Sequence, residues 1–230
     1  MEESISLQVI ARIRSDFTSK FGIPRQSNLV PEQEALIVFE PAYRDENALR
    51  GLEGYSHLWL IWGFSEVKQA GWSPMVKPPK LGGNKRMGVF ATRSPFRPNP
   101  LGLSSVRLLG LEKRPNLGTV LLVSGADLMD GSPIYDIKPY LSFTDSHPEA
   151  RNGFAADHVD EKLPVEFPPE LLGRIPKEKR AALLASLALD PRPGYLAGRS
   201  DPYGFAYAGK DVRFYVEGGV VKVFDVVEGS

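Results

Sequence analysis

Apolar runs of strand length fill about the first 145 residues of the chain, and this feature limits the fold more than any other. ISLQVIARI alternates apolar and polar residues, ALIVFE is short, and SHLWLIWGF reads as a strand buried on both faces. LSSVRLLGLEK and GTVLLVSGADL, separated by RPN, predict a hairpin. The alternating run in MDGSPIYDIKPYLSF predicts one more strand after a tight turn. Many short strands joined by Gly- and Pro-rich turns indicate a barrel or a sandwich.

The rest of the chain predicts a second unit. Residues 145–169 are polar and proline-rich, which is typical of a linker or a domain boundary. After them, Pro176 stands at a first-turn position and residues 177–190 have the clearest helical pattern of the chain. The end, YGFAYAGKDVRFYVEGGVVKVFDVV, predicts three strands with a turn at EGG. We therefore expect a mainly β domain over residues 1–150 and a small α+β domain over residues 160–230.

Composition excludes several kinds of site and partner. The 28 Lys and Arg residues balance 28 Asp and Glu, so an anionic partner must be bound by local clusters of positive charge. The chain has no cysteine, which rules out thiolate catalysis and cysteine-based zinc sites and fits a reducing cytoplasm. The three histidines are not at metal-ligand spacing, and no apolar run approaches the ~20 residues of a membrane span. We expect a cytoplasmic protein without a metal, a signal peptide or a membrane segment.

The central segment GVFATRSPFRPNPLGLSSV, residues 88–106, is unusually rigid and cationic for a connection between strands. Each of its three prolines fixes φ and favours an extended preceding residue, so the loop loses little entropy when it binds a ligand. Arg93 and Arg97 supply planar donors suited to carboxylate or phosphate, and Asn99 can both donate and accept. A structural strut with solvated arginines is the alternative. Rigid loops with polar side chains on a β scaffold usually carry function, so we favour a binding site.

Three further segments carry weaker signals. In DGSPIYDIKPY, residues 130–133 have strong turn chemistry, and Asp136 and Lys138 share one face of the following strand. A surface ion pair after a hairpin turn explains them equally well. GIPRQ, residues 22–26, is a short loop that a plain connection also explains. DPRPGY, residues 190–195, either stops the helix or forms a platform on which a base stacks beside an arginine.

These segments together resemble one family. No P-loop, GxGxxG fingerprint or Ser-His-Asp order stands out in the sequence. GVFATRSPFRPNPLGLSSV, DGSPIYDIKPYL, IPRQ, GLEGYSHLWLIW and DPRPGY instead resemble the TrmO family, also called TsaA-like or YaeB-like, of S-adenosylmethionine-dependent tRNA methyltransferases. The likeness runs from VIARIRSDF almost to the end of the chain. The Arg-Ser-Pro and Arg-Pro-Asn-Pro run in the centre is its most specific part.

The resemblance implies a non-Rossmann methyltransferase with an N-terminal β-barrel that binds S-adenosylmethionine. It also implies a homodimer with the cofactor near the subunit interface, and a C-terminal unit that helps to hold the tRNA. The implied reaction is methylation of N6 of N6-threonylcarbamoyladenosine at position 37 of a threonine tRNA.

The family's motifs assign the cofactor contacts to four segments of this chain. They are Pro24, Arg25 and Gln26; Phe64 and Ser65; Arg93 and Leu103; and Asp130, Gly131, Ser132 and Pro133. At Phe64 and Ser65 the sequence departs from the more polar pair, often His-Gln, expected in the family. Backbone contacts would survive that change.

Candidate substrate contacts follow from the chemistry of the acceptor. Threonylcarbamoyladenosine carries a carboxylate, which suits Arg97 or Lys138, with Asn99 beside them. Its N6 must lose a proton, and Asp136, or alternatively Asp130, is a candidate acceptor. An anticodon-loop base can be splayed out and stacked. Tyr195 and Arg192 are the candidates for that contact, and Phe90 and Phe96 are candidate aromatic walls near the sulfonium.

Three other readings fit parts of the sequence. The enzyme could methylate another RNA or a small molecule. The chain could be a non-catalytic RNA-binding module in which the Arg/Pro loop is the platform. It could also be a plain dimerisation domain, which predicts no cofactor binding at all.

Overall fold

The structure of the chain is a computed structural model that describes residues 4–64, 72–78, 85–158, 162–192 and 201–229. Most of the regular structure is β. The strands are β1 Ala11–Arg14, β2 Glu34–Phe39, β3 His57–Gly63, β4 Met75–Val76, β5 Met87–Gly88, β6 Leu101–Arg114, β7 Gly118–Ser124, β8 Pro133–Pro139, β9 Val165–Glu166, β10 Tyr203–Tyr207, β11 Lys210–Glu217 and β12 Val220–Glu228. The α-helices are α1 Ser142–Asp145, α2 Pro169–Leu172 and α3 Arg180–Ala188. Short 3₁₀ turns lie at Pro41–Tyr43, Glu46–Leu49, Leu52–Gly54, Val89–Ala91, Gly153–His158 and Lys177–Lys179.

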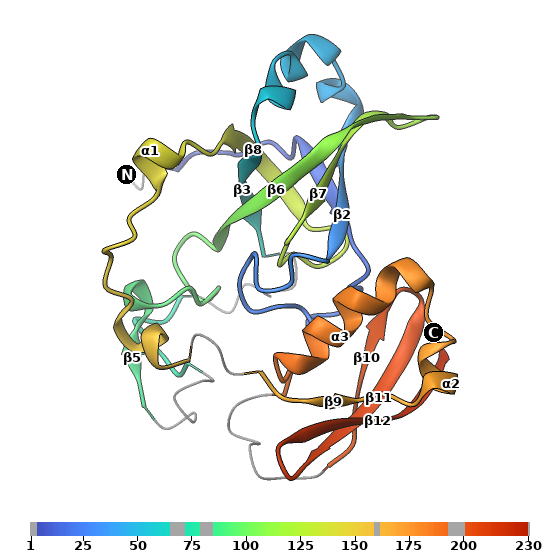
Figure 1. The fold of residues 1–230 in the computed structure, drawn as a ribbon. Coiled ribbons are helices and arrows are strands. Elements are labelled where there is room, and N and C mark those ends of the chain that lie inside the picture. Colours follow the sequence, from blue (N-terminus) through green and yellow to red (C-terminus); the bar gives the residue numbers. More distant parts are fainter. Residues whose placement is uncertain (1–3, 65–71, 79–84, 159–161, 193–200, 230) are drawn as a thin grey trace.

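Six strands form a closed barrel in the order β1-β2-β7-β6-β3-β8, in which β8 pairs again with β1 (Figure 1). All six pairings are antiparallel. Closure leaves no unpaired edge in this sheet. The prediction of a mainly β fold with an N-terminal barrel is thereby confirmed.

The barrel interior explains the period of two in the sequence. In β6 every second residue from Gly102 to Leu108 is buried, and residues between them face outward. The same holds for β3, where Leu58, Leu60 and Trp62 point inward and the residues between them are half-buried. The expectation that β3 is buried on both faces is therefore correct for the inner face only, because the barrel has just one filled side.

The predicted hairpin of β6 and β7 is confirmed. Between β2 and β3, the Asp45 carboxylate accepts from the N–H of Asn47 at 2.9 Å and caps the turn at Glu46–Leu49. The predicted strand through residue 143 is too long. β8 ends at Pro139, and the Asp145 carboxylate accepts from the Leu141 N–H at 3.0 Å, which closes the short helix α1. A proline at a strand end and a local side-chain cap together stop the ladder.

The C-terminal unit is a four-stranded sheet in the order β10-β11-β12-β9, with α3 packed against it (Figure 1). The three C-terminal strands are as predicted. The helix predicted over residues 177–190 consists of a 3₁₀ turn at Lys177–Lys179 followed by α3, which ends at Ala188. β9 was not predicted. It adds two residues in parallel to β12 from within the proline-rich segment, and so short a strand leaves no periodicity in the sequence.

The second hydrophobic core includes residues from the N-terminal part of the chain. Phe17 and Val30, in the connection between β1 and β2, are buried among side chains of the C-terminal unit. The ring of Phe17 lies edge-on to that of Tyr207, with 5.2 Å between centroids. The β1–β2 connection is thus held by the C-terminal unit as well as by the barrel. No helix within the described residues is long and apolar enough to cross a membrane.

Candidate functional site

One end of the barrel gathers three long connections. In an antiparallel ring, β1, β7 and β3 finish at the same end at which β2, β8 and β6 begin. The connections β1–β2, β3–β6 and β7–β8 therefore meet there. They carry, or directly adjoin, the described residues of the predicted cofactor set: Pro24, Arg25, Gln26, Phe64, Arg93, Leu103, Asp130, Gly131, Ser132 and Pro133. Ser65 and Tyr195 lie outside the described residues.

Gln26 and Arg93 form a direct contact between two of these connections. The Arg93 guanidinium donates to Oε1 of Gln26, across 67 positions of sequence. The Arg93 side chain is otherwise exposed. The pair therefore brings the IPRQ segment and the central Arg/Pro loop together, with a cationic group facing outward.

Arg25 points in a different direction from Gln26. Its guanidinium donates to the backbone carbonyls of Asp190 at 3.2 Å and Arg192 at 2.8 Å. These carbonyls follow α3 in the C-terminal unit. In this structure Arg25 ties the β1–β2 connection to that unit, and its predicted contact with the cofactor stays a prediction.

The turn at Asp130–Pro133 is bound firmly to the end of β1. Gly131, at φ +76°, donates its N–H to the Ile13 carbonyl at 2.8 Å, and the Asp130 carboxylate accepts from the Ser15 N–H at 3.0 Å. A left-handed φ favours glycine at this position. The Asp130 carboxylate is thus bonded to the backbone, as is that of Asp136, whose Oδ1 accepts from the Ile137 N–H at 2.9 Å.

The central loop holds its own shape. Thr92 Oγ1 donates to the Val89 carbonyl at 2.9 Å, and the Arg97 N–H donates to the Pro95 carbonyl at 2.9 Å. Arg97 Nη1 also donates to the Thr92 carbonyl at 3.2 Å, while Asn99 is exposed. This self-contained bonding agrees with a loop made rigid by proline.

Leu103 and Asp136 lie on the outer face of the barrel in one row of the sheet. Ile61 of β3 pairs with Leu103 on one side and with Asp136 on the other. Strand spacing places the two outer residues about 10 Å apart. Leu103 is 56% exposed, and the Asp136 carboxylate is paired with Lys138 Nζ at 2.9 Å. A β-bulge between Ile61 and Trp62 sets this register, which the sequence does not reveal.

A chain of polar side chains at the same end of the barrel was not predicted from the sequence. The Trp62 indole N–H donates to Ser104 Oγ at 2.9 Å, and Ser104 Oγ donates to Asp127 Oδ1 at 2.6 Å. Burial raises the pKa of the Asp127 carboxyl above its usual range, although the Ser104 hydroxyl and the charge of Arg93 act in the opposite direction. In sequence, SGAD after a strand looks like an ordinary turn, so no signal pointed to Asp127.

Arg192 is 5% exposed, and its Nε and Nη2 form a bidentate ion pair with the carboxylate of Asp190 at 2.8 and 2.9 Å. Asp190 itself has φ +48°. The pair closes the end of α3 and presents the carbonyls that Arg25 binds. Arg192 therefore has a structural role in this conformation, and its predicted contact with RNA stays a prediction.

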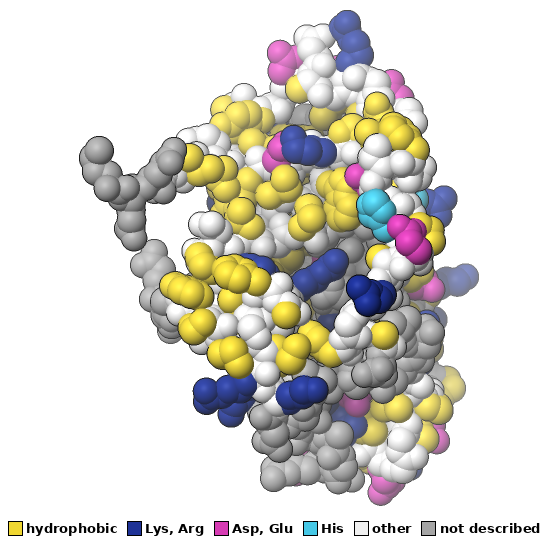
Figure 2. All heavy atoms as spheres, turned by 90° about the vertical axis from the view of Figure 1, so that its left-hand side faces the viewer, with side chains coloured by type: hydrophobic (Ala, Val, Ile, Leu, Met, Phe, Trp, Pro, Cys, Tyr) yellow, Lys and Arg dark blue, Asp and Glu magenta, His cyan; other side chains and the backbone are white. Residues whose placement is uncertain are grey.

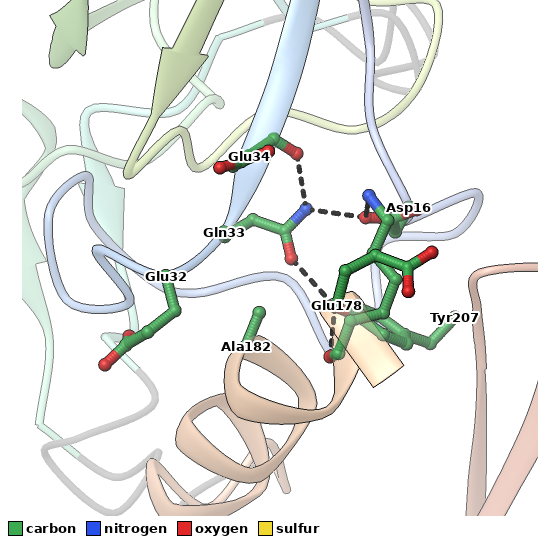
Figure 3. Close-up of a pocket in the computed structure, with 8 residues that line it drawn as sticks. Asp16, Glu32, Gln33, Glu34, Glu178, Ala182 and Tyr207 are labelled. Carbon is green, nitrogen blue, oxygen red and sulfur yellow. Dashed lines mark hydrogen bonds and ion pairs between the residues drawn. The ribbon is translucent and has the colours of Figure 1, made fainter. Parts of the chain in front are cut away.

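A second polar cluster joins the barrel end to the C-terminal unit. Gln33 Nε2 donates to Asp16 Oδ2 at 3.0 Å, and Lys179 Nζ contacts the same oxygen at 2.7 Å (Figure 3). The hydroxyl of buried Tyr207 lies 3.1 Å from both Gln33 Oε1 and the Lys179 carbonyl. The adjoining cavity of about 40 Å³ has room for only a few waters and is too small for a nucleoside. This cluster fixes the two units together and is not itself a ligand site.

The face that carries α1 and β5 has many apolar side chains with Lys and Arg between them (Figure 2). Phe90, Phe96, Leu101 and Leu103 are exposed large apolar side chains from the central loop and the start of β6, and Phe143 of α1 is 83% exposed. Contiguous exposed apolar surface usually marks a binding or association surface. Among the described residues, no three acidic or histidine side chains are grouped so that they could hold a metal ion.

Two family models match the sequence. That of the tRNA-methyltransferase O N-terminal domain matches residues 12–146, and that of the TrmO C-terminal domain matches residues 160–229. The chain belongs to the TrmO family. This confirms the resemblance drawn from the motifs.

Individual TrmO relatives are similar over most of their length. The tRNA (adenine(37)-N6)-methyltransferase of Escherichia coli (strain K12) is 41% identical over 201 residues, which is 85% of either chain. That of Eikenella corrodens is 45% identical over 178 residues, 76% of this chain and 99% of the relative. A crystal structure of TrmO from Pseudomonas aeruginosa superposes with a TM-score of 0.79 at 34% identity, covering 100% of this chain and 99% of that one.

Proposed function

We propose that this chain is a tRNA (adenine(37)-N6)-methyltransferase that uses S-adenosylmethionine. The observation that carries the proposal is similarity over both units, at 41% identity and 85% coverage, to a relative with that name. A relative in Pseudomonas aeruginosa, 38% identical over 98% of this chain, is named a putative S-adenosylmethionine-dependent methyltransferase.

The residues at the barrel end fit the chemistry of this cofactor. The exposed guanidinium of Arg93 suits a carboxylate, such as that of the cofactor's amino-acid part. The exposed side chain of Leu103 offers an apolar surface of the kind that lies against a nucleoside. When bound, S-adenosylmethionine supplies a methyl group on a positively charged sulfur. We propose that Gln26, Arg93, Leu103 and the turn at Asp130–Pro133 hold it.

The protein's main task in methyl transfer is to position the two reactants. The acceptor nitrogen must lie close to the methyl carbon and in line with its bond to sulfur. A loop that keeps its shape through proline and its own hydrogen bonds suits this task, because it need not be ordered during binding. Aromatic faces favour a neighbouring cation, and exposed Phe90 and Phe96 of the same loop are the candidates.

We further propose that the acceptor is N6-threonylcarbamoyladenosine at position 37 of a threonine tRNA. Its carboxylate would be stabilised by a cation near the cofactor. Arg97 is the first candidate, because it lies only four positions beyond Arg93 in the rigid loop. Lys138 is the second candidate, although its ammonium is paired with Asp136. Asn99, exposed at the end of the loop, can bond the same group.

Replacement of Arg97 by alanine tests this role. Loss of a bidentate, charge-assisted contact should lower the single-turnover rate on the modified tRNA about tenfold or more. The affinity for S-adenosylhomocysteine, measured by titration calorimetry, should stay nearly unchanged. Arg107→Ala, in the middle of β6 and outside the central loop, is the matched control and should affect neither quantity. An equal loss of cofactor affinity in Arg97→Ala would contradict the assignment.

Asp136 is the proposed proton acceptor for N6. A positioned base typically contributes about 10²–10⁴ to a rate, so Asp136→Asn should lower the single-turnover rate within that range at saturating cofactor. The exposed carboxylate of Glu112 gives a control variant, Glu112→Gln, that should behave like the unmodified protein. A rate unchanged in Asp136→Asn would remove this residue from the mechanism.

The protein is proposed to act as a homodimer, with the exposed apolar face of Figure 2 as the surface that a second copy would cover. The C-terminal unit is proposed to hold the tRNA through the DPRPGY segment with Arg192 and Tyr195. Because phosphate contacts release counterions, tRNA binding should weaken as salt rises.

Mass spectrometry of tRNA nucleosides from cells with and without the protein tests the reaction. Loss of methylated threonylcarbamoyladenosine on removal of the protein is the expected result. Labelled S-adenosylmethionine incubated with purified protein and total tRNA separates the alternatives. Label on another nucleoside would indicate a different acceptor, and no transfer of label would favour a non-catalytic RNA-binding module.

A further inference from the structure

Asp127 lies where all three connections at the barrel end meet. It belongs to the β7–β8 connection and accepts a hydrogen bond from Ser104 of β6. Asn28 of the β1–β2 connection donates its N–H to the Gly125 carbonyl at 2.8 Å, two residues before Asp127. The neighbouring Ser27 N–H and the Arg93 charge both act on the Asp127 carboxyl. Arg93 comes from the β3–β6 connection, so residues of the two other connections both act on this one carboxylate of the β7–β8 connection.

The Ser104 hydroxyl fixes the orientation of the Asp127 carboxylate. Ser104 is 1% exposed, and its hydroxyl has one proton, which it donates to Asp127 while it accepts from the Trp62 indole. Rotation of the hydroxyl would break one of these two hydrogen bonds. The oxygen–oxygen distance of 2.6 Å lies within the range of a hydroxyl bonded to an ionised carboxylate. The chain from Trp62 to Asp127 therefore holds a negative charge in one place.

The charge of Arg93 acts on this carboxylate, and the hydrogen bond that Arg93 makes lies in the predicted site. Arg93 is bonded to Gln26, and both belong to the segments assigned to the cofactor. An arginine that is bonded to a neutral amide alone would keep much of its rotational freedom. A buried negative charge nearby restricts the guanidinium and keeps its remaining donors turned to the site.

We propose that Asp127 is a positioning residue that acts through Arg93 to hold the cofactor-binding arrangement of Arg93 and Gln26. The inference rests on the proposed function, since it assumes that Arg93 binds S-adenosylmethionine. It adds a residue outside the cofactor set that the motifs assigned.

A double-mutant cycle tests the proposal. The variants are Asp127→Asn, Arg93→Ala and the pair, and the measurement is the Kd for S-adenosylhomocysteine by titration calorimetry. Asparagine keeps the shape and an oxygen that accepts from Ser104, so it removes the charge and leaves the hydrogen bond. We expect Asp127→Asn to weaken the binding of S-adenosylhomocysteine roughly tenfold when Arg93 is present. When Arg93 is replaced by alanine, Asp127→Asn should have almost no further effect.

Asp145→Asn is the matched control. Asp145 is likewise a carboxylate that accepts a side-chain hydrogen bond, from the Trp59 indole at 2.8 Å, but it lies near α1 and outside the three connections. It should leave the Kd unchanged. If Asp127→Asn fails to fold, as judged by circular dichroism, Ser104→Ala replaces it in the cycle, because it frees the carboxylate without removing its charge. A severalfold loss of affinity that vanishes in the Arg93→Ala background is then expected.

Two results would overturn this inference and leave the proposed function standing. One is full affinity in Asp127→Asn, which would reduce Asp127 to a hydrogen-bond acceptor for Ser104. The other is a loss of equal size with and without Arg93, which would mean that Asp127 acts independently of it. Absence of any binding by the unmodified protein would instead overturn the proposed function on which the inference rests.

Discussion

Gly22→Ala is expected to lower the free energy of unfolding by about 2–5 kcal/mol and to weaken cofactor binding with it. Gly22 has φ +95°, which costs an L-residue about 1–2 kcal/mol. A Cβ at this position would lie 2.3 Å from Cδ2 of Phe205, in the core of the C-terminal unit. Relief of such a clash typically costs about 1–3 kcal/mol more. The two effects have different causes, so they add.

The functional part of this prediction follows from where Gly22 lies. It precedes Pro24, Arg25 and Gln26 in the connection that Phe17 anchors in the second core. A shift of the chain away from Phe205 would move Gln26 relative to Arg93. Thermal denaturation reports the stability, and titration with S-adenosylhomocysteine reports the site.

Gly51→Ala is the matched control for the backbone contribution. Gly51 has φ +85°, but a Cβ there would meet nothing within 4 Å. It should cost about 1–2 kcal/mol and leave the cofactor Kd unchanged. If Gly22→Ala and Gly51→Ala lower the free energy of unfolding equally, the clash with Phe205 does not contribute to the loss of stability.

Gly102→Ala is expected to disturb the central motif itself. A Cβ at Gly102 would lie 2.2 Å from Cε2 of Trp62, the residue opposite it in the β3–β6 ladder. The indole covers the glycine, so an added methyl must push the ring aside at a cost of about 1–3 kcal/mol. The displaced ring can no longer donate to Ser104, and the chain that orients Asp127 is broken. Cofactor affinity should therefore fall together with stability.

Gly110→Ala separates this effect from a general loss of β6. Gly110 lies in the same strand, and a Cβ there would meet nothing within 4 Å. We expect it to be nearly neutral in both denaturation and titration. Trp62→Phe gives a second comparison, because it removes the indole donor and leaves room beside Gly102. Full cofactor affinity in both Gly102→Ala and Trp62→Phe would show that the Trp62–Ser104 bond does not support the site.

Much of the fold was accessible from local pattern. The two apolar runs on either side of RPN predicted the hairpin of β6 and β7, because the signal of a hairpin spans only a few residues. The end of β8 and the strand β9 were not recognised. Their limits depend on Asp145 folding back onto Leu141 and on β12 offering an edge, and neither leaves a periodic trace.

The candidate site, too, was predictable only where the signal is local in sequence. The motif segments predicted its residues, including Gln26, Arg93 and Leu103. Such motifs are recognised from residue types and short spacings alone. Arg25 and Arg192 show the limit of this approach. Both looked like ligand-binding cations, and the structure pairs them with the carbonyls and the carboxylate that end α3.

What the sequence by itself determined is therefore the β-rich barrel, the family and the list of candidate contacts, since these depend on local periodicity and on motifs. What only the tertiary structure decided is how those contacts meet. Ring closure brings three connections to one end, and a bulge in β8 turns Asp136 to the same outer face as Leu103. Asp127 was recognised only in the tertiary structure, because its burial and its surroundings are not local in sequence. Ser104, which donates to it, and Arg93, whose charge acts on it, lie 23 and 34 positions away along the chain.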